Sequence, residues 1–320
     1  MRLVLGFDGG GTKTDCVLLD ESGAVLARAQ SGPSNPLRVG FGAALAAVRD
    51  AARAATGQAK LAPDAQVAAL CAGLAGAGPP ESAEKIRVLL SAEFPHSRIQ
   101  VCTDLDVALA AAGDGPAIVL LAGTGSFAIG RNSAGETSRA GGYGSQIGDE
   151  GSAYDIGRRA VLTAMHAHDR TGSDSALGQR LLRELGCAGW PDVQLRAQAA
   201  SDEVFPRLFS VVASLAEIGD AASQGILRAA AFDLAMHVGN VVARLHLGDT
   251  PCFIAKTGGM MGRSKFLEAE LDTRLRGGFP DAQLGQLRMA PAEAAARMAL
   301  QVLAANPTPA AVPEHGRPLT

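Results

Sequence analysis

The sequence predicts an α/β protein built from two copies of a βββαβαβα domain that face each other across a cleft. The chain has 320 residues, and at about 150 residues per domain this length favours two domains. Strands alternate with helices in both halves, an order typical of mixed, partly parallel sheets covered by helices. When residue n is laid over residue n + 112, Gly11-Thr12 falls on Gly123-Thr124 and Gly23 falls on Gly135. This correspondence indicates a duplication, with one glycine turn from each copy lining the cleft.

The first half opens with three short apolar runs separated by glycine-bearing turns, which predict a three-stranded antiparallel meander. Apolar runs and helical stretches then alternate to complete the first copy. The predicted strands are residues 2–7, 14–19, 24–29, 66–71 and 98–102, and the predicted helices are 41–55, 81–92 and one that begins near Leu105.

The second half repeats this order, with extra helices inserted between about residues 151 and 247. We place the N-terminal domain at residues 1–113 and the C-terminal domain at 114–305, whose last helix can return to the N-terminal domain. Residues 306–320 contain four prolines and form a tail, because proline cannot continue a helix. The predicted elements around the insertion are strands 117–122 and 126–131, a turn at 134–135, strand 251–255, helix 263–274, strand 284–289 and helix 292–303.

Composition excludes several classes of protein. The 29 Lys and Arg residues against 32 Asp and Glu give a net charge of −3, which leaves no basic surface for a nucleic acid. The most apolar long stretch, residues 226–247, is broken by charged and histidine residues, whereas a membrane span needs about 20 nearly uninterrupted apolar residues. Five scattered cysteines without a close pair argue against a disulfide framework or a zinc site. We therefore expect a soluble cytoplasmic protein with neither a nucleic-acid partner nor a membrane segment.

The stretch Gly6 to Asp15 carries the strongest chemical signal. Three consecutive glycines, Gly9 to Gly11, follow a predicted strand, and such a run lets backbone N–H groups converge into an anion-binding nest. Thr12 and Lys13 add a hydroxyl and a cation, and Asp8 could hold Mg²⁺ against phosphate oxygens. The Walker A pattern fails because Thr12 separates Gly11 from Lys13, and a dinucleotide fingerprint fails because a strand follows. The alternative is a tight hairpin in which the glycines serve only the turn.

Two further glycine turns are weaker signals by themselves. Gly123-Thr124-Gly125-Ser126 carries no charge, but its place in the duplication makes it the second half of a phosphate clamp. Gly258-Gly259 lies between a predicted strand and a predicted helix, where it serves either an ordinary turn or close approach to a nucleotide base.

Five segments together resemble the BadF/BadG/BcrA/BcrD-type ATPase family, which includes N-acetylglucosamine kinase, within the acetate kinase, sugar kinase, Hsp70 and actin superfamily. The similarity extends from the first strand to about Leu303, and the combination of motifs is specific although no single motif is. The segments are GFDGGGTKTD at 6–15, CTDLDVALAA at 102–111, LLAGTGSFAIG at 120–130, GGYGSQIGDEGSAYDIGR at 141–158 and TGGMMG at 257–262.

The resemblance implies two ribonuclease H-like domains in an actin-like ATPase fold, a homodimer, and a reaction that uses ATP and Mg²⁺ to phosphorylate the 6-hydroxyl of an amino sugar. Asp104 would be the general base, and Asp8 would organise Mg²⁺, in part through water. The ATP-binding residues would be Gly9, Gly10, Gly11, Thr12, Lys13, Gly123, Thr124, Gly125, Ser126, Gly258 and Gly259, and the sugar-binding residues would be Asn35, Gly142, Tyr143, Asp149 and Glu150.

Two of these assignments have structural alternatives. Asp104 stands where a strand ends and a helix begins, so its side chain could instead cap the helix, and Asp106 competes for the same cap. Phosphoryl transfer does need one proton acceptor beside the attacking hydroxyl, which favours Asp104 as the base. Asp149 and Glu150 precede a predicted helix and could equally serve its dipole.

We favour N-acetylglucosamine as the substrate and keep glucosamine as the alternative. Ala75 stands where eukaryotic N-acetylglucosamine kinases carry serine, and Tyr143 stands where they carry tryptophan. A second alternative is an ATPase that activates an acyl-CoA dehydratase or reductase, but no cysteine for an iron–sulfur cluster lies near residues 141–151. A sugar sensor without turnover has no support, since no DNA-binding segment is visible.

Overall fold

The computed structural model describes residues 1–59, 61, 66–248 and 250–305. The chain divides into two compact units, and each is described by itself. The first unit joins Met1–Val107 to the segment that begins at Ala290, and the second unit is Ala108–Met289. The proline-containing tail predicted at residues 306–320 lies outside the described residues.

The first unit is a five-stranded mixed sheet in the order β3-β2-β1-β4-β5. The β1, β2 and β3 strands pair antiparallel, as expected for a meander, whereas β4 and β5 pair parallel to β1 and to each other. Neighbouring parallel strands need a crossover connection. Helix α2 lies in the connection that leads to β4, and α3 lies in the connection from β4 to β5. The strands are β1 Arg2–Gly9, β2 Thr14–Asp20, β3 Val25–Ser31, β4 Gln66–Leu74 and β5 Arg98–Cys102, and the helices are α1 Pro36–Val39, α2 Phe41–Gln58, α3 Pro80–Glu93 and α4 Asp104–Ala111.

Alternate residues of the central strand β1 fill two separate cores in this unit. Leu3, Leu5 and Phe7 are fully buried against α2 and α3, while Val4 belongs to the opposite face. The side-chain period of two in a strand produces this division.

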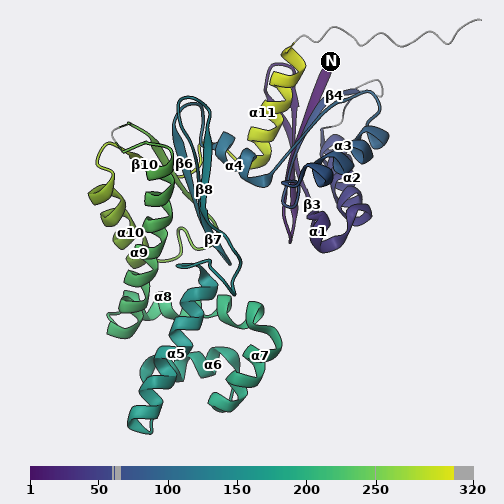
Figure 1. The fold of residues 1–320 in the computed structure, drawn as a ribbon. Helices are drawn as coiled ribbons and strands as arrows, with labels where there is room; N and C mark the ends of the chain where they lie inside the picture. Colours follow the sequence, from purple (N-terminus) through teal and green to yellow (C-terminus); the bar gives the residue numbers. More distant parts are fainter. Residues whose placement is uncertain (60, 62–65, 249, 306–320) are drawn as a thin grey trace, which may run out of the picture. The chain divides into compact units, whose positions relative to one another are not determined.

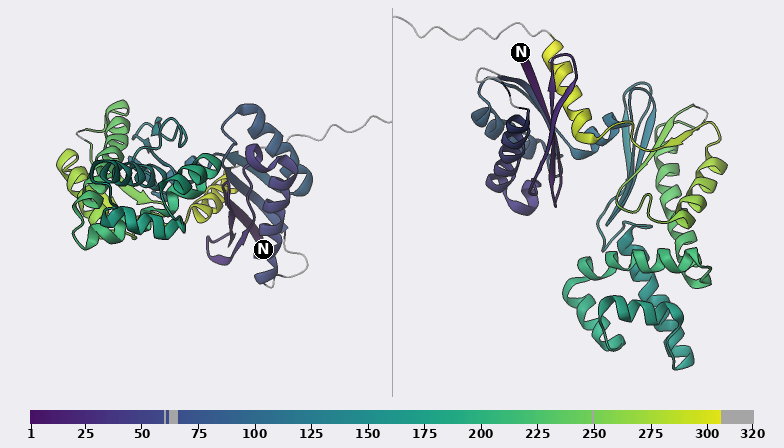
Figure 2. Two further views of the ribbon diagram at one scale, coloured as in Figure 1. Left: turned by 90° about the horizontal axis from the view of Figure 1, so that it is seen from below. Right: turned by 180° about the vertical axis from the view of Figure 1, so that it is seen from behind.

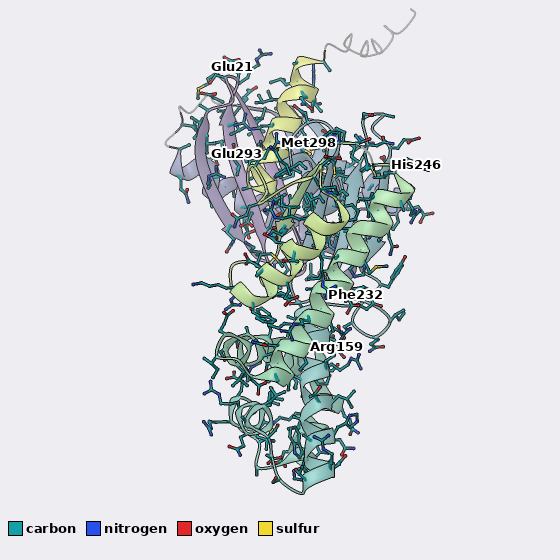
Figure 3. All side chains as sticks on the ribbon, turned by 90° about the vertical axis from the view of Figure 1, so that its left-hand side faces the viewer. Glu21, Arg159, Phe232, His246, Glu293 and Met298 are labelled. Carbon is teal, nitrogen blue, oxygen red and sulfur yellow. The ribbon has the colours of Figure 1, made fainter. Side chains whose placement is uncertain are left out.

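The last helix, α11 (Pro291–Ala304), packs on that opposite face of the first unit (Figure 1; Figure 2 shows it from behind). Its buried face consists of alanines, and a Cβ added at Gly6 would overlap the backbone of Ala292 and Ala296. Small residues on both sides therefore allow the helix backbone to approach the strand closely. Glu293 and Met298 are labelled on this helix in Figure 3. Glu293 forms a salt bridge of 2.5 Å with Arg28 of β3.

The second unit contains the other five-stranded sheet, in the order β10-β9-β6-β7-β8. Strands β6, β7 and β8 pair antiparallel, and β9 and β10 add to β6 in parallel. Five helices, α5 to α9, separate β8 from β9 in the chain. The bounds are β6 Ala117–Ala122, β7 Ser126–Arg131, β8 Thr137–Gly141, α5 Ala153–Thr171, α6 Ala176–Leu185, α7 Trp190–Arg207, α8 Phe209–Glu217, α9 Ala221–Arg244, β9 Phe253–Thr257, α10 Lys265–Gly278 and β10 Gln283–Gly285.

The helix α9 is the core helix of the second unit. It packs against α5, α8 and α10 and against the sheet, and its buried residues include Leu227, Leu234 and Val241 (Figure 1). By length and composition alone, α9 is long and apolar enough to cross a membrane, and half of that stretch is buried inside the protein.

The two sheets have the same strand order and the same strand directions, which confirms the prediction of an α/β protein with two duplicated halves. Each unit has three antiparallel strands followed by two parallel ones on the other side of the first strand. Gly23 and Gly135, which the duplication pairs, both turn with positive φ, at 85° and 83°.

Several predicted elements differ by a few residues at their ends, and two differences have a clear physical reason. Strand β10 ends at Gly285, not at Met289, because the Arg288 N–H donates to Ala111 O (3.0 Å) and so leaves the ladder with β9. Helix α1 was not predicted, since four residues are too few for a periodic signal. Asn35 and Pro36 do mark its start, as an N-cap and a first-turn proline.

Candidate functional site

The turn between β1 and β2 is held by hydrogen bonds to two other segments of the first unit. The Gly10 N–H donates to Lys13 O at 2.9 Å and closes the turn. Gly10 O accepts from the N–H groups of Ser34 (3.0 Å) and Asn35 (3.1 Å), and Gly9 O accepts from the Ala75 N–H at 2.8 Å. The predicted phosphate loop is therefore fixed in position before any ligand binds.

Gly9 and Gly10 of this loop are glycines for different reasons. A Cβ at Gly9 would overlap the hydroxyl of Ser34, a buried side chain whose Oγ accepts from Thr14 Oγ1 at 2.7 Å. A Cβ at Gly10 would meet only Lys13 O, at 4.0 Å. Gly9 thus permits close packing, while Gly10 leaves open space beside the loop of the kind that a ligand oxygen needs.

Asp8 lies at the carboxyl end of β1, opposite Asp15 of β2. The pKa of the Asp8 carboxyl is raised to about 7, chiefly by burial and then by the negative charges of Asp104 and Asp15, while the Lys13 cation opposes the shift. Three carboxylates therefore act on one another in this corner of the first unit, and a bound cation would relieve their repulsion.

Asp104 begins α4, and the residue before it caps the helix. Thr103 is the capping residue: the Asp106 N–H donates to Thr103 Oγ1 at 3.2 Å, and Asp106 Oδ2 accepts from the Thr103 N–H (2.9 Å) and hydroxyl (2.7 Å). This reciprocal arrangement is a capping box. Thr103 and Asp106 therefore form this cap. The Asp104 carboxylate accepts from the Leu105 N–H at 3.1 Å and lies near enough to Asp8 to raise its pKa.

Asn35 lies beside the phosphate loop because its own N–H is bonded to Gly10. Its side-chain Oδ1 accepts from the Leu37 N–H at 3.0 Å and so caps α1. Sequence reasoning missed the next cation along the chain, Arg38, whose guanidinium lies over Gly11. Its position could have been inferred only from the short helix α1, which gave no periodic signal.

In the second unit, the turn Gly123 to Ser126 joins β6 to β7. Its Gly123 N–H donates to Gly125 O at 2.9 Å. The carbonyls of Gly123 and Thr124 accept from the N–H groups of Ala153 (2.9 Å) and Tyr154 (3.4 Å), in the first turn of α5. The N-terminus of α5 therefore fixes this second glycine turn.

Gly258 and Gly259 lie directly beside that turn. The Gly258 backbone has φ of 105°, and a Cβ there would overlap the backbone of Ala122, the last residue of β6. A Cβ on Gly123 would lie 3.6 Å from the Gly259 nitrogen. The structure thus brings the second predicted phosphate turn and the predicted adenosine motif together within one unit.

These neighbouring glycines give a matched pair of variants. We expect Gly258→Ala to lower the free energy of unfolding by about 1–3 kcal/mol, because alanine at this positive φ is strained and its Cβ overlaps Ala122. Gly259→Ala has open space and should change stability by less than about 0.5 kcal/mol. Chemical denaturation measures both, and equal effects of the two substitutions would contradict this account.

The loop between β8 and α5 carries the predicted sugar-binding residues. Asp149 is buried with φ of 60°, and its carboxylate accepts from the backbone N–H groups of Ser126 and Gly144. Burial raises the pKa of Asp149 above its ordinary value, although these donors oppose the shift. Glu150 O accepts from the Ser126 hydroxyl at 2.7 Å, so the sugar loop and the second glycine turn form one structure.

Tyr143 and Glu150 line a cavity of about 530 Å³ between this loop and α9. The Tyr143 side chain is exposed, and Gly142 O accepts a hydrogen bond from Arg139. The polar and charged residues of the cavity wall are Arg139, Asp233, His237, Asn240 and Arg244.

The predicted site residues form two groups, each within one unit. The first group contains Asp8, the loop Gly9 to Lys13, Asn35 and Asp104. The second contains the turn Gly123 to Ser126, Gly258-Gly259, and the sugar loop with Gly142, Tyr143, Asp149 and Glu150. Across residues 1–59, 61, 66–248 and 250–305, no cluster of three or more His, Cys, Asp and Glu side chains is arranged to hold a metal ion.

A profile of the BadF/BadG/BcrA/BcrD ATPase family matches residues 5–286. The chain belongs to this family. Among curated relatives of this BadF-type ATPase, the N-acetylmuramic acid/N-acetylglucosamine kinase of Clostridium acetobutylicum is 29% identical over 287 residues, which are 89% of this chain and 94% of the relative. The N-acetyl-D-glucosamine kinase of Dictyostelium discoideum is 29% identical over 312 residues, or 93% and 98% of the two chains.

Solved structures of similar proteins confirm the fold predicted for this BadF-type ATPase, that of the actin-like sugar kinases. A Chromobacterium violaceum protein assigned as an N-acetylglucosamine kinase superimposes with a TM-score of 0.76 at 28% identity, over 94% of this chain and 99% of the other. A ROK family glucokinase from Streptomyces griseus gives a TM-score of 0.57 at 16% identity, over 93% and 99% of the two chains, and this likeness concerns the fold alone.

Proposed function

We propose that this chain is an ATP-dependent kinase that transfers a phosphoryl group to the 6-hydroxyl of N-acetylglucosamine. The observation that carries the proposal is the placement of Asp104 near Asp8 and the glycine loop in the first unit, with its helix capped by Thr103 and Asp106. A carboxylate beside a phosphate loop is what a phosphotransferase needs as its proton acceptor.

The residues present fit ATP and Mg²⁺. Gly10 offers open space and a fixed backbone for phosphate oxygens, and the Asp8 carboxyl, with its raised pKa, gains from a neighbouring cation. Carboxylate oxygen is a ligand that Mg²⁺ prefers, with phosphate oxygens and water completing its coordination. When bound, Mg²⁺ would neutralise charge that develops on the phosphates.

In the proposed reaction Asp104 holds the 6-hydroxyl of the sugar and accepts its proton. The oxygen of that hydroxyl forms a bond to the γ-phosphorus, and the bond from this phosphorus to the β,γ-bridging oxygen breaks with its electron pair leaving on ADP. The first glycine loop and the turn Gly123 to Ser126 bind phosphates, and Gly258-Gly259 lies against adenosine. Asn35, Gly142, Tyr143, Asp149 and Glu150 bind the sugar.

N-acetylglucosamine is the first choice of substrate, because the kinases named above act on it and match most of this chain. Glucosamine is the alternative, since the glucosamine kinase GspK of Vibrio cholerae is 32% identical over 170 residues, 53% of this chain and 56% of the relative. Asp149 and Glu150 give the sugar loop two carboxyl groups, which would suit the cationic amine of glucosamine.

A sugar panel tests the proposal. Purified protein with Mg²⁺ and ATP should release ADP when N-acetylglucosamine is added and much more slowly with glucose or without sugar, in a coupled assay. Nuclear magnetic resonance of the product should place the phosphate on the 6-oxygen. A higher kcat/KM with glucosamine would establish the alternative substrate. ATP hydrolysis that no sugar accelerates, together with iron in anaerobically purified protein, would favour an activator ATPase instead.

The proposal includes a homodimer, which the family resemblance implies, and a cytoplasmic location, which the composition favours. Gel filtration with light scattering measures the first, and fractionation of the source cells measures the second.

A further inference from the structure

We propose that Arg38 binds the phosphoryl group that is transferred, and that it rather than Lys13 is the cation of the first phosphate loop. This inference rests on the proposed kinase function. Arg38 lies near the end of α1, and its side chain extends over Gly11: a Cβ built on Gly11 would lie 2.7 Å from Arg38 Nη1 and 3.2 Å from its Cδ.

The position of Arg38 is determined by several contacts at the base of α1. The N–H groups of Ser34 and Asn35 are bonded to Gly10 O, so the segment before the helix is joined to the phosphate loop. The Arg38 N–H donates to Asn35 O at 3.0 Å, and the Asn35 side chain caps the same helix. The backbone of Arg38 is therefore held beside the loop, within reach of its side chain.

Lys13 and Arg38 differ in whether an acidic side chain is paired with them. Lys13 Nζ forms a 2.8 Å ion pair with Asp15, so its charge is already compensated. No ion pair engages the Arg38 guanidinium within residues 1–59, 61, 66–107 and 290–305, the described part of its unit, and the side chain is exposed. An exposed guanidinium over a glycine loop, with no carboxylate partner among these residues, is suited to bind an anion there.

The location of Arg38 indicates which anion. The helix that carries it begins at Asn35, a predicted sugar-binding residue, and its guanidinium covers the loop predicted to bind phosphate. A planar guanidinium can donate two parallel hydrogen bonds to a phosphoryl group, which a lysine ammonium cannot. A group placed between sugar and phosphates would contact the phosphoryl group both before transfer, on ATP, and after transfer, on the sugar.

The test compares Arg38→Gln with the wild-type chain, with Arg38→Lys as the conservative variant. Arg87→Gln removes an exposed arginine of α3, paired with Glu84, and serves as the matched control. For Arg38→Gln we expect kcat to fall at least about 100-fold, as for other arginines that stabilise a transferred phosphoryl group, with partial recovery in Arg38→Lys. Arg87→Gln should keep the wild-type kcat.

Ligand binding gives a second readout that does not depend on turnover. Titration calorimetry with Mg²⁺ should show that Arg38→Gln weakens binding of the β,γ-imido analogue of ATP at least tenfold and changes ADP binding less than threefold. Equal losses for both nucleotides, or no loss for either, would overturn the assignment to the transferred group. Wild-type protein that binds both nucleotides but phosphorylates no sugar would refute the kinase function, while the two titrations would still decide the role of Arg38.

Discussion

Replacing Asp104 with asparagine is expected to lower kcat for sugar phosphorylation by about 10²- to 10⁴-fold, the range for loss of a general base. Asparagine has nearly the same shape and can still accept a hydrogen bond from the Leu105 N–H, but it cannot take up the proton of the attacking hydroxyl. The affinity for ATP should change little, because the glycine loop holds its position through Ser34, Asn35 and Ala75.

Asp106 offers a matched control on the same helix. Asp106→Asn makes the same chemical change two residues further on, at a side chain that caps α4 through Thr103. We expect a modest loss of stability, on the order of 1 kcal/mol, and a kcat within about tenfold of wild type. Steady-state kinetics with nucleotide titration measures both variants. A kcat that falls more in Asp106→Asn than in Asp104→Asn would contradict the assignment of the base.

Asp8→Asn is expected to make the ligand-free protein more stable at pH 8 while reducing its activity. The pKa of Asp8 is raised from 3.8 to about 7 in the folded chain by burial and by Asp104 and Asp15. Between these two values the unfolded chain is ionised at this position and the folded chain is protonated, so the free energy of unfolding falls as the pH rises through that window. Above about pH 7 the full cost of ionising Asp8 in the folded chain is present, on the order of 4 kcal/mol of the free energy of unfolding.

Thermal or chemical denaturation of both proteins at pH 5 and pH 8 measures this difference. The free energy of unfolding of the variant should exceed that of wild type at pH 8. This difference should shrink toward pH 5, where the folded wild-type Asp8 is already neutral. Asp50→Asn, at an exposed carboxylate of α2, is the control and should show no such dependence. An Asp8→Asn protein that is less stable than wild type at pH 8 would contradict the raised pKa.

The same pKa predicts a link between nucleotide binding and protons. A bound Mg²⁺ favours the ionised carboxylate, so binding of Mg·ATP below pH 7 should release a proton from Asp8. Calorimetry in two buffers of different ionisation enthalpy measures this release, which Asp8→Asn should abolish. The kinetic loss in this variant should accompany a higher requirement for Mg²⁺.

The order of strands and helices along the chain, and the mixed character of each sheet, could be predicted because they follow from local patterns. Short apolar runs with glycine turns require an antiparallel meander, and a helix between two apolar strands requires a parallel pair. The end of β10 could not be predicted, since the Arg288 N–H leaves the ladder for a carbonyl at Ala111, far away in sequence.

The candidate site was predicted in its residue types but not in its contacts. The motif at residues 102–111 named Asp104 as the base, yet only the structure shows that Thr103 and Asp106 cap the helix. The position of Arg38 over Gly11 depends on hydrogen bonds between Gly10 and residues 34–35. Such long-range backbone bonds have no periodic signature in a sequence.

The alanine face of α11 makes the first unit depend on a helix that follows the whole second unit in the chain. A fragment that stops at Val107 would contain all five strands of that sheet yet leave Val4, Val17 and Cys71 without their cover. The two halves of this protein are therefore not separable by a single cut. A fragment that carries the first unit alone would need residues 290–305 joined to residues 1–107.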